Sequence, residues 1–292
     1  MGKQFVGAIF DGILGGGVYA LMAIGLTLIF GVLDIINIAQ GILVILAAYL
    51  SYLLSVHLHI DLFVGLLITI PVMFVIGVVI HRLFMQRLRG HERTSMSLLA
   101  SYAVMIIIEG ILYLGFGSQY KALNAWYVNS TVHVFGVYLP VIDIFGFGLA
   151  LLLVAVLYLT LYRTKYGRSL RATMQDHVAA RLIGINVNRV ATLAFGIGVA
   201  VTAIGGMVYG ADNAFNPNSG YDLISRLLAI IILGGLGSIG GAMVAAIFMT
   251  TLEAVVDIWS PTWSVVVFYA ALVLVLTFRP VGLFGRQEAR SH

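Results

Sequence analysis

The sequence has no cysteine, few prolines and few charged residues. Its 292 residues include no Cys and 5 Pro, and only 10% are Asp, Glu, Lys or Arg. The lack of cysteine excludes a disulfide framework, thiolate metal ligands and a thiol nucleophile. Soluble globular proteins are about one quarter charged. A soluble enzyme of this length could not cover its surface with so few charges, so the composition argues strongly against that class.

Long apolar runs take the place of the missing charge. Hydrophobic residues make up 61% of the chain. A membrane-spanning helix needs about 20 apolar residues, and a membrane barrel would instead alternate polar and apolar residues. We therefore predict an all-α, polytopic membrane helix bundle with about eight or nine transmembrane or re-entrant segments, forming a single domain over residues 1–292. The expected segments are residues 12–33, 35–55, 62–81, 95–117, 141–162, 190–211, 223–236, 240–258 and 262–278.

Two of the connections between these segments have unusual features. Only Asp34 and its neighbours join the first two segments, which predicts a tight hairpin. The segments 223–236 and 240–258 are short, interrupted by glycine and nearly contiguous. They are either two tilted spans or one broken, re-entrant pair.

Basic residues are concentrated in three polar regions, at residues 82–93, 163–189 and 279–290. These regions hold 13 of the 16 Lys and Arg residues. Connections rich in Lys and Arg usually remain in the cytoplasm. We therefore expect a multi-pass membrane protein, with these regions inside and the N-terminus outside. The acidic residues Asp61, Asp143, Asp212, Asp222 and Asp257 fall at the opposite ends of the segments.

Residues 118–139 form a long connection on the expected outer side. Val132, Val134 and Val137 alternate with other residues. Alternation of this kind is typical of a half-buried strand. We expect a small external cap or β-hairpin here.

Residues 163–189 form the longest basic connection. From residue 168 to 183 the pattern predicts one short amphipathic helix, with Leu170, Met174, Val178 and Leu182 recurring at intervals of four. Gly184 is placed to end this helix. The apolar stripe has two interpretations: the helix lies on the membrane surface, or it docks a soluble cytoplasmic partner.

Four polar residues lie within or beside apolar segments, namely Asn37, Gln40, Glu109 and Glu253. Polar groups at bilayer depth face a partner, a cavity or water. Asn37, Gln40 and Glu109 are candidates for lining a substrate path. A structural hydrogen bond inside the bundle is the alternative role for each of them.

The glycines between residues 234 and 241 formally match the dinucleotide-binding pattern G-x-G-x-x-G. No strand–helix–strand context surrounds them, so they are better explained by a helix break and close packing. We assign that role to Gly234, Gly235, Gly237 and Gly241. The sequence also lacks the pattern G-x-x-x-x-G-K-[ST], and its seven histidines are scattered, so we expect no ATPase site, metal or other cofactor.

Residues 19–41, 166–186, 233–242 and 279–285 together resemble the permeases of the branched-chain amino-acid ABC importers, and more closely the H-type (LivH-type) permease than the M-type. The order and spacing of these stretches match over nearly the whole chain. The sequence departs from the family pattern at Gln40, Ile42, Gln175 and Gly240, where His, an acidic residue, Glu and Pro are usual.

The resemblance implies a set of partners and a coupling loop. The partners are a second, M-type (LivM-type) permease, two cytoplasmic ATPase subunits and a periplasmic binding protein. The loop at residues 163–189 would then contact an ATPase subunit. The coupling residues implied are Gly167, Arg168, Asp176, Ala179, Ala180 and Gly184.

The resemblance therefore implies a permease subunit of the bacterial inner membrane, without its own ATPase site. It would carry branched-chain or related amino acids, or small organic acids, by ATP-driven alternating access. The principal alternative is a self-sufficient secondary transporter or channel for a small polar solute, in which Glu109 or Glu253 would carry protons.

Overall fold

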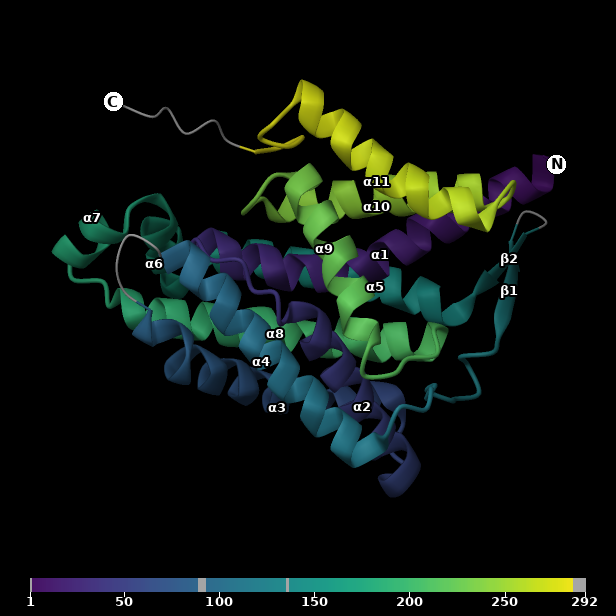
Figure 1. The fold of residues 1–292 in the computed structure, drawn as a ribbon, viewed down its shortest axis with the longest axis horizontal. Coiled ribbons are helices and arrows are strands. Elements are labelled where there is room, and N and C mark those ends of the chain that lie inside the picture. The colour runs from purple at the N-terminus through teal and green to yellow at the C-terminus, as the bar shows by residue number, and fades with distance from the viewer. Residues whose placement is uncertain (1, 89–92, 135–136, 286–292) are drawn as a thin grey trace.

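A computed structural model describes residues 2–88, 93–134 and 137–285. Most of its helices run along one long axis (Figure 1). Within the described residues, eight helices are long and apolar enough to cross a membrane. They are α1 (Gly2–Leu33), α2 (Gln40–Leu58), α3 (Leu62–Leu83), α4 (Arg93–Phe116), α5 (Val141–Arg163), α8 (Val187–Asp212), α10 (Ile239–Asp257) and α11 (Pro261–Phe278). The predicted polytopic helix bundle is confirmed.

The two ends of the bundle differ in charge. One end, on the left of Figure 1, carries the basic connection at residues 163–189, which contains the short helices α6 (Lys165–Gln175) and α7 (His177–Leu182). The turn η1 (Met85–Arg87) lies at the same end. We call this the basic end. The opposite end carries the N-terminus of α1 and a β-hairpin, and we call it the acidic end. Residues 89–92 and 286–292, which include parts of the first and third basic regions, lie outside the described residues.

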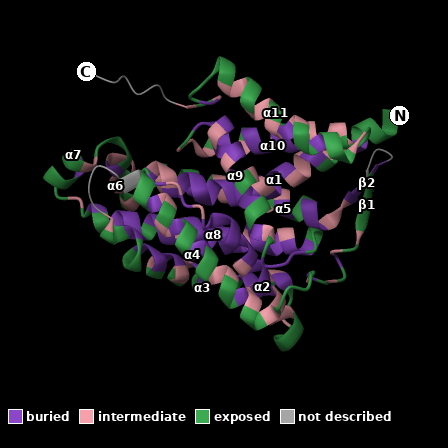
Figure 2. Ribbon diagram, viewed as in Figure 1, coloured by how far each residue is buried: buried purple, intermediate pink, exposed green. Residues whose placement is uncertain are grey.

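α1 and α8 form the centre of the bundle, and the other long helices surround them. Figure 2 shows buried residues concentrated in these two helices and exposed residues on the outer ones. The two helices approach closely where Gly25 meets Gly198. A Cβ on Gly198 would lie 2.7 Å from the carbonyl oxygen of Gly25. Glycine at both positions therefore allows the two backbones to come into contact.

The expected tight hairpin between the first two segments is wrong. α1 ends at Leu33, and the chain then returns into the bundle as a non-helical segment over residues 34–39. The Ser101 hydroxyl of α4 accepts a hydrogen bond from the Ile38 N–H at 3.1 Å. Backbone groups inside a membrane protein need partners of this kind. α2 consequently begins inside the bundle, and it packs on α8, α9 and α3 instead of running back along α1.

A short helix, α9 (Ser219–Gly234), begins beside the start of α2. Gly41 of α2 lies against Gly220 of α9, and a Cβ on Gly41 would also lie 2.9 Å from the Ile224 nitrogen. α9 ends near Gly31 of α1, at the basic end, where Gly237 lies 3.4 Å from a Cβ built on Gly31. α10 then returns to the acidic end. The chain therefore crosses the bundle twice here, first through residues 213–218 and the 16-residue α9, and then through α10. A re-entrant pair would instead turn back before it reached the basic end.

The contact between Gly41 and Gly220 leads to a stability prediction. Gly41→Ala places a methyl group against backbone atoms that cannot move aside, and overpacking of this kind costs about 1–3 kcal/mol of unfolding free energy. Gly148→Ala is the matched control, because a Cβ on that helical glycine meets nothing within 4 Å. Thermal unfolding in detergent, followed by circular dichroism, should show a lower midpoint for Gly41→Ala and an unchanged or higher one for Gly148→Ala. Equal midpoints for the two variants would contradict the close packing of α2 on α9.

The long connection between α4 and α5 ends in the expected β-hairpin. β1 (Thr131–Val134) pairs with β2 (Val137–Pro140) in antiparallel register, with Thr131 opposite Pro140. The hairpin lies at the acidic end, beside the start of α1, where Val137 packs 3.3 Å from a Cβ built on Gly7. Earlier in the same connection, Lys121 forms an antiparallel bridge with Phe215, which precedes α9.

Candidate functional site

The basic loop contains two short helices instead of the single helix expected over residues 168–183. α6 ends at Gln175, and α7 begins at His177. Asp176 between them is extended, with φ −158° and ψ 115°, and its carboxylate accepts hydrogen bonds from the N–H groups of Val178 at 2.6 Å and Ala179 at 3.0 Å. The expectation of one helix is wrong because the aspartate caps the second helix instead of continuing the first.

The break divides the predicted apolar stripe. Leu170 is 1% exposed and anchors α6 to the bundle, whereas Leu182 is 83% exposed. Val178 and Ile183 are also exposed large apolar residues. Together, Val178, Leu182 and Ile183 form what we call the α7 surface. This surface lies on α7, the shorter of the two helices of the loop, which projects from the basic end (Figure 1).

The glycines of the loop hold α6 and α7 in place. Gly167 is buried where α6 folds back on α5, and a Cβ there would lie 2.5 Å from the Leu161 Cα. Gly184 follows α7 with φ 85°. Its N–H bonds to the carbonyl of Arg181, and the Ile185 N–H bonds to that of Ala180, both at 3.0 Å, which is the glycine-dependent C-terminal arrangement of a helix.

The other expected coupling residues divide by exposure. Ala180 is buried against the bundle, while Arg168, Asp176 and Ala179 are exposed. The two small alanines therefore face in different directions, one into the protein and one into solvent. Tyr166 ties the loop to α8 through a 3.3 Å hydrogen bond from its hydroxyl to the Val190 carbonyl.

The cap at Asp176 also leads to a prediction. The hydrogen bonds from Ala179 and Val178 lower the pKa of the Asp176 carboxyl below its ordinary value. Because the folded pKa is lowered, the carboxylate stabilises the loop above the ordinary pKa, and this stabilisation is lost as the pH falls through the folded value. Asp176→Ala removes the cap, whereas Asp176→Asn keeps an acceptor. At neutral pH we expect trypsin to cut after Arg181 several-fold faster in Asp176→Ala than in Asp176→Asn, measured by mass spectrometry. Equal cleavage rates would show that the cap does not order α7.

Asn37 and Gln40 lie together inside the bundle. The Asn37 amide donates to Gln40 Oε1 at 3.2 Å, and the Gln40 amide donates to the Gly198 carbonyl at 3.4 Å. Both side chains are fully buried. They therefore connect the non-helical segment before α2 to the central helix α8, and in this conformation they line no open surface.

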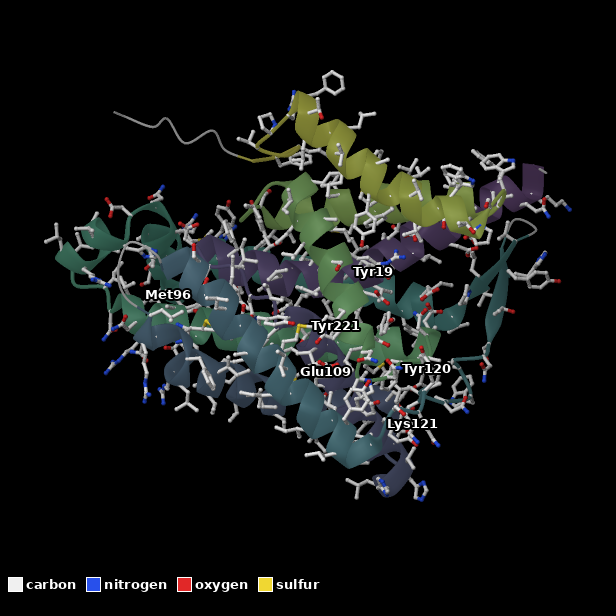
Figure 3. All side chains as sticks on the ribbon, in the orientation of Figure 1. Tyr19, Met96, Glu109, Tyr120, Lys121 and Tyr221 are labelled. Carbon is white, nitrogen blue, oxygen red and sulfur yellow. The ribbon has the colours of Figure 1, made fainter. Side chains whose placement is uncertain are left out.

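Glu109 lies elsewhere, on the outer side of α9. Its carboxylate accepts a 2.7 Å hydrogen bond from the Tyr221 hydroxyl in the first turns of α9. Figure 3 shows Glu109 and Tyr221 close together on one face of the molecule, with Tyr120 and Lys121 nearer the acidic end. Gln40 is followed by Gly41, which contacts Gly220 at the start of α9. Asn37 and Gln40 therefore lie near the inner side of this helix start, whereas Glu109 lies near its outer side.

The glycine-rich turn lies between α9 and α10. Gly235 and Gly237 have φ of 95° and 82°, and the Gly241 N–H donates to Ser238 Oγ at 3.1 Å at the start of α10. A Cβ on Gly234 would lie 2.6 Å from the carbonyl carbon of Gly241. These positions require glycine for backbone conformation and for close approach.

The C-terminal segment completes this turn. The N–H groups of Leu283 and Phe284 donate to the carbonyls of Leu233 and Gly234, at 2.8 and 3.2 Å. The last carbonyls of a helix have no partner within the helix. The tail therefore supplies the hydrogen bonds that α9 lacks at its end.

Sequence reasoning missed Tyr221 and Arg226 on α9. Arg226 forms an ion pair with Glu253 of α10, at 2.5 Å between Nη1 and Oε2. Its guanidinium lies over the ring of Phe268, 5.3 Å from the centroid. The available signal was that Arg226 is a basic residue inside an apolar segment, far from the three basic regions.

Comparison with known proteins identifies the family. Residues 8–276 match the family model of the branched-chain amino acid transport system permease component. The chain belongs to this family. It is thus a permease component and a multi-pass protein of the inner, plasma membrane.

Relatives in the branched-chain permease family match along nearly their whole length. The high-affinity branched-chain amino acid transport system permease protein BraD of Pseudomonas aeruginosa is 29% identical, over 96% of each chain. The corresponding protein LivH of Escherichia coli is 29% identical, over 98% of this chain and 97% of its own. A probable branched-chain permease LivH of Methanocaldococcus jannaschii is 25% identical, over 91% and 88%. Among solved structures, PsaBC from Streptococcus pneumoniae in complex with Fab has a TM-score of 0.49 at 12% identity, covering 94% of this chain and 95% of its own, which is too low to support a structural argument.

Proposed function

We propose that this permease carries branched-chain or related amino acids, or small organic acids, as one subunit of an ABC importer. The names of its BraD and LivH relatives support the substrate class. The proposed partners are a second, M-type permease, two cytoplasmic ATPase subunits and a periplasmic binding protein. ATP is bound and hydrolysed by the ATPase subunits, and this chain contributes the translocation path.

The α7 surface is the observation that carries the proposal. Val178, Leu182 and Ile183 are exposed at the basic end, which positive-inside bias assigns to the cytoplasm. Large exposed apolar side chains that are rimmed by polar residues are typical of an interaction site. The alternative, that this surface lies on the lipid, is less favoured because α7 projects beyond the ends of the long helices (Figure 1).

Transport would follow from movement of this loop. Gly167 packs α6 tightly on the end of α5, and Tyr166 holds α6 to α8. A displacement of α7 by the ATPase would therefore reach a central helix of the bundle through α6. Alternating access requires a shift of this kind between two arrangements of packed helices.

The alternative of a self-sufficient, proton-coupled transporter receives no support from Glu253. Its carboxylate binds the Arg226 guanidinium and so forms a link between α9 and α10. Glu109 has no such basic partner in the part of the chain that the structure describes.

Assembly with the ATPase subunits tests the proposal. The chain, co-expressed with its partner permease and the ATPase subunits and purified in detergent through a tag on this chain, should elute from size exclusion as one complex containing the ATPase. If the ATPase is absent while the chain itself is folded and monodisperse, the proposal is wrong.

A further inference from the structure

Glu109 places a carboxylate at bilayer depth, on a helix, α4, whose surface is largely exposed. It lies seven residues before Phe116, where α4 ends, or about 10 Å along the helix axis. α4 packs chiefly on α2, and Glu109 is only half-buried. An ionisable side chain at this depth faces a protein partner or a water-filled cavity, because lipid cannot solvate it.

The hydrogen bonds of this carboxylate are incomplete. An ionised carboxylate has about four acceptor positions. The Tyr221 hydroxyl fills one of them, and no other described residue donates to Glu109. The remaining acceptor positions can accept hydrogen bonds from a ligand.

Aromatic side chains surround the carboxylate. Tyr102 and Tyr113 are separated from Glu109 by seven and four residues along α4, and helical periodicity places all three on one face. Tyr102 and Tyr221 are exposed large side chains. A carboxylate flanked by tyrosine rings is suited to an ammonium group, which pairs with the negative charge and contacts the negative faces of the rings.

The cations of the described chain do not neutralise Glu109. Arg226 is paired with Glu253, and that is the one ion pair among the described residues. Lys121 lies over the ring of Tyr52, 5.9 Å from its centroid. No cation among the described residues is therefore paired with Glu109.

We propose that Glu109, with Tyr102, Tyr113 and Tyr221 around it, receives the ammonium group of the transported solute. The inference rests on the proposed function and narrows its substrate class. Solutes with a primary ammonium group are accepted, and organic acids that lack one are excluded from this subsite. The helix N-terminus of α9 offers no competing anion site, since Gly41 packs directly against Gly220.

The experiment measures binding of two fragments of leucine to the assembled importer in zwitterionic nanodiscs. Isopentylammonium keeps the ammonium group, and 4-methylpentanoate keeps the carboxylate. Saturation-transfer NMR detects weak binding of either fragment. We expect Glu109→Gln to weaken binding of isopentylammonium at least about tenfold, consistent with loss of a charge-assisted contact. Binding of 4-methylpentanoate should not change.

Tyr221→Phe separates ligand binding from a structural role. In Glu109→Gln the amide oxygen still accepts the Tyr221 hydrogen bond, so the link between α4 and α9 remains. Tyr221→Phe removes that link but leaves the Glu109 carboxyl group in place. We expect Tyr221→Phe to weaken isopentylammonium binding less than threefold. Equal losses in the two variants would assign Glu109 to a structural bridge and overturn the proposal, and so would an absence of isopentylammonium binding to the unmodified importer. If the same preparation drives ATP-dependent uptake of L-leucine, the proposed function stands even though the subsite does not.

Discussion

Leu182→Asp is expected to lower ATP-driven transport by at least about tenfold, with the permease still folded and inserted. The side chain is exposed on the α7 surface, so a charge there does not enter the core. It would instead place an unpaired carboxylate in an apolar interface with the ATPase, where altering one of the few dominant residues costs about 2 kcal/mol or more. The measurement is the stimulation of ATP hydrolysis by loaded binding protein in proteoliposomes, together with uptake.

The matched control adds the same charge at a neighbouring polar position. Asn188 is exposed near the start of α8, and Asn188→Asp should leave coupling within about twofold of the original. Leu170 is not a suitable position, because it is buried and a charge there would disturb the fold. If Leu182→Asp retains full coupling, or if Asn188→Asp loses it equally, the α7 surface is not the contact.

Glu253→Ala should produce the largest loss of stability. It leaves the Arg226 guanidinium among apolar helices without its partner, and breaking a buried pair in this way costs about 3–5 kcal/mol. The side chains of the pair are 21% and 18% exposed, so we expect the lower end of that range. Thermal and denaturant unfolding in mixed micelles would measure it.

The double variant Arg226→Leu/Glu253→Leu is the control for this prediction. It removes both charges, and replacing an entire buried pair with apolar side chains is often neutral or stabilising. We expect the double variant to be more stable than Glu253→Ala. The reverse order would mean that the single substitution acts through lost packing, and not through an uncompensated charge.

The bundle was predictable because bilayer thickness sets the length of each apolar segment. The ends of α1, α3, α5 and α8 lie close to the expected boundaries at the basic end, where polar residues interrupt the apolar runs. The hairpin at residues 131–140 was predictable from alternation. The start of α2 was not, because Ile35 and Ile36 are as apolar as the helix that follows them, and their non-helical path depends on Ser101 in another helix.

The candidate site was less predictable, because its pairings link distant residues. Leu170, Met174, Val178 and Leu182 recur with helical spacing across Asp176, so the pattern predicts one continuous helix. The hydrogen bonds that the Asp176 carboxylate accepts divide that helix into two. Gln40 meets Gly198, and Glu109 meets Tyr221, at separations of 158 and 112 residues. Periodicity carries no information about such contacts. The residue types alone marked them as polar groups that needed partners.

ATP-driven uptake by the complete importer tests the central claim most directly. Proteoliposomes containing this chain, its partner permease and the ATPase subunits would be supplied with binding protein outside, ATP inside and labelled L-leucine. We predict uptake that requires ATP and the ATPase subunits, and no uptake by the chain alone under a proton or sodium gradient. Gradient-driven uptake by the purified chain without ATPase subunits would contradict the account.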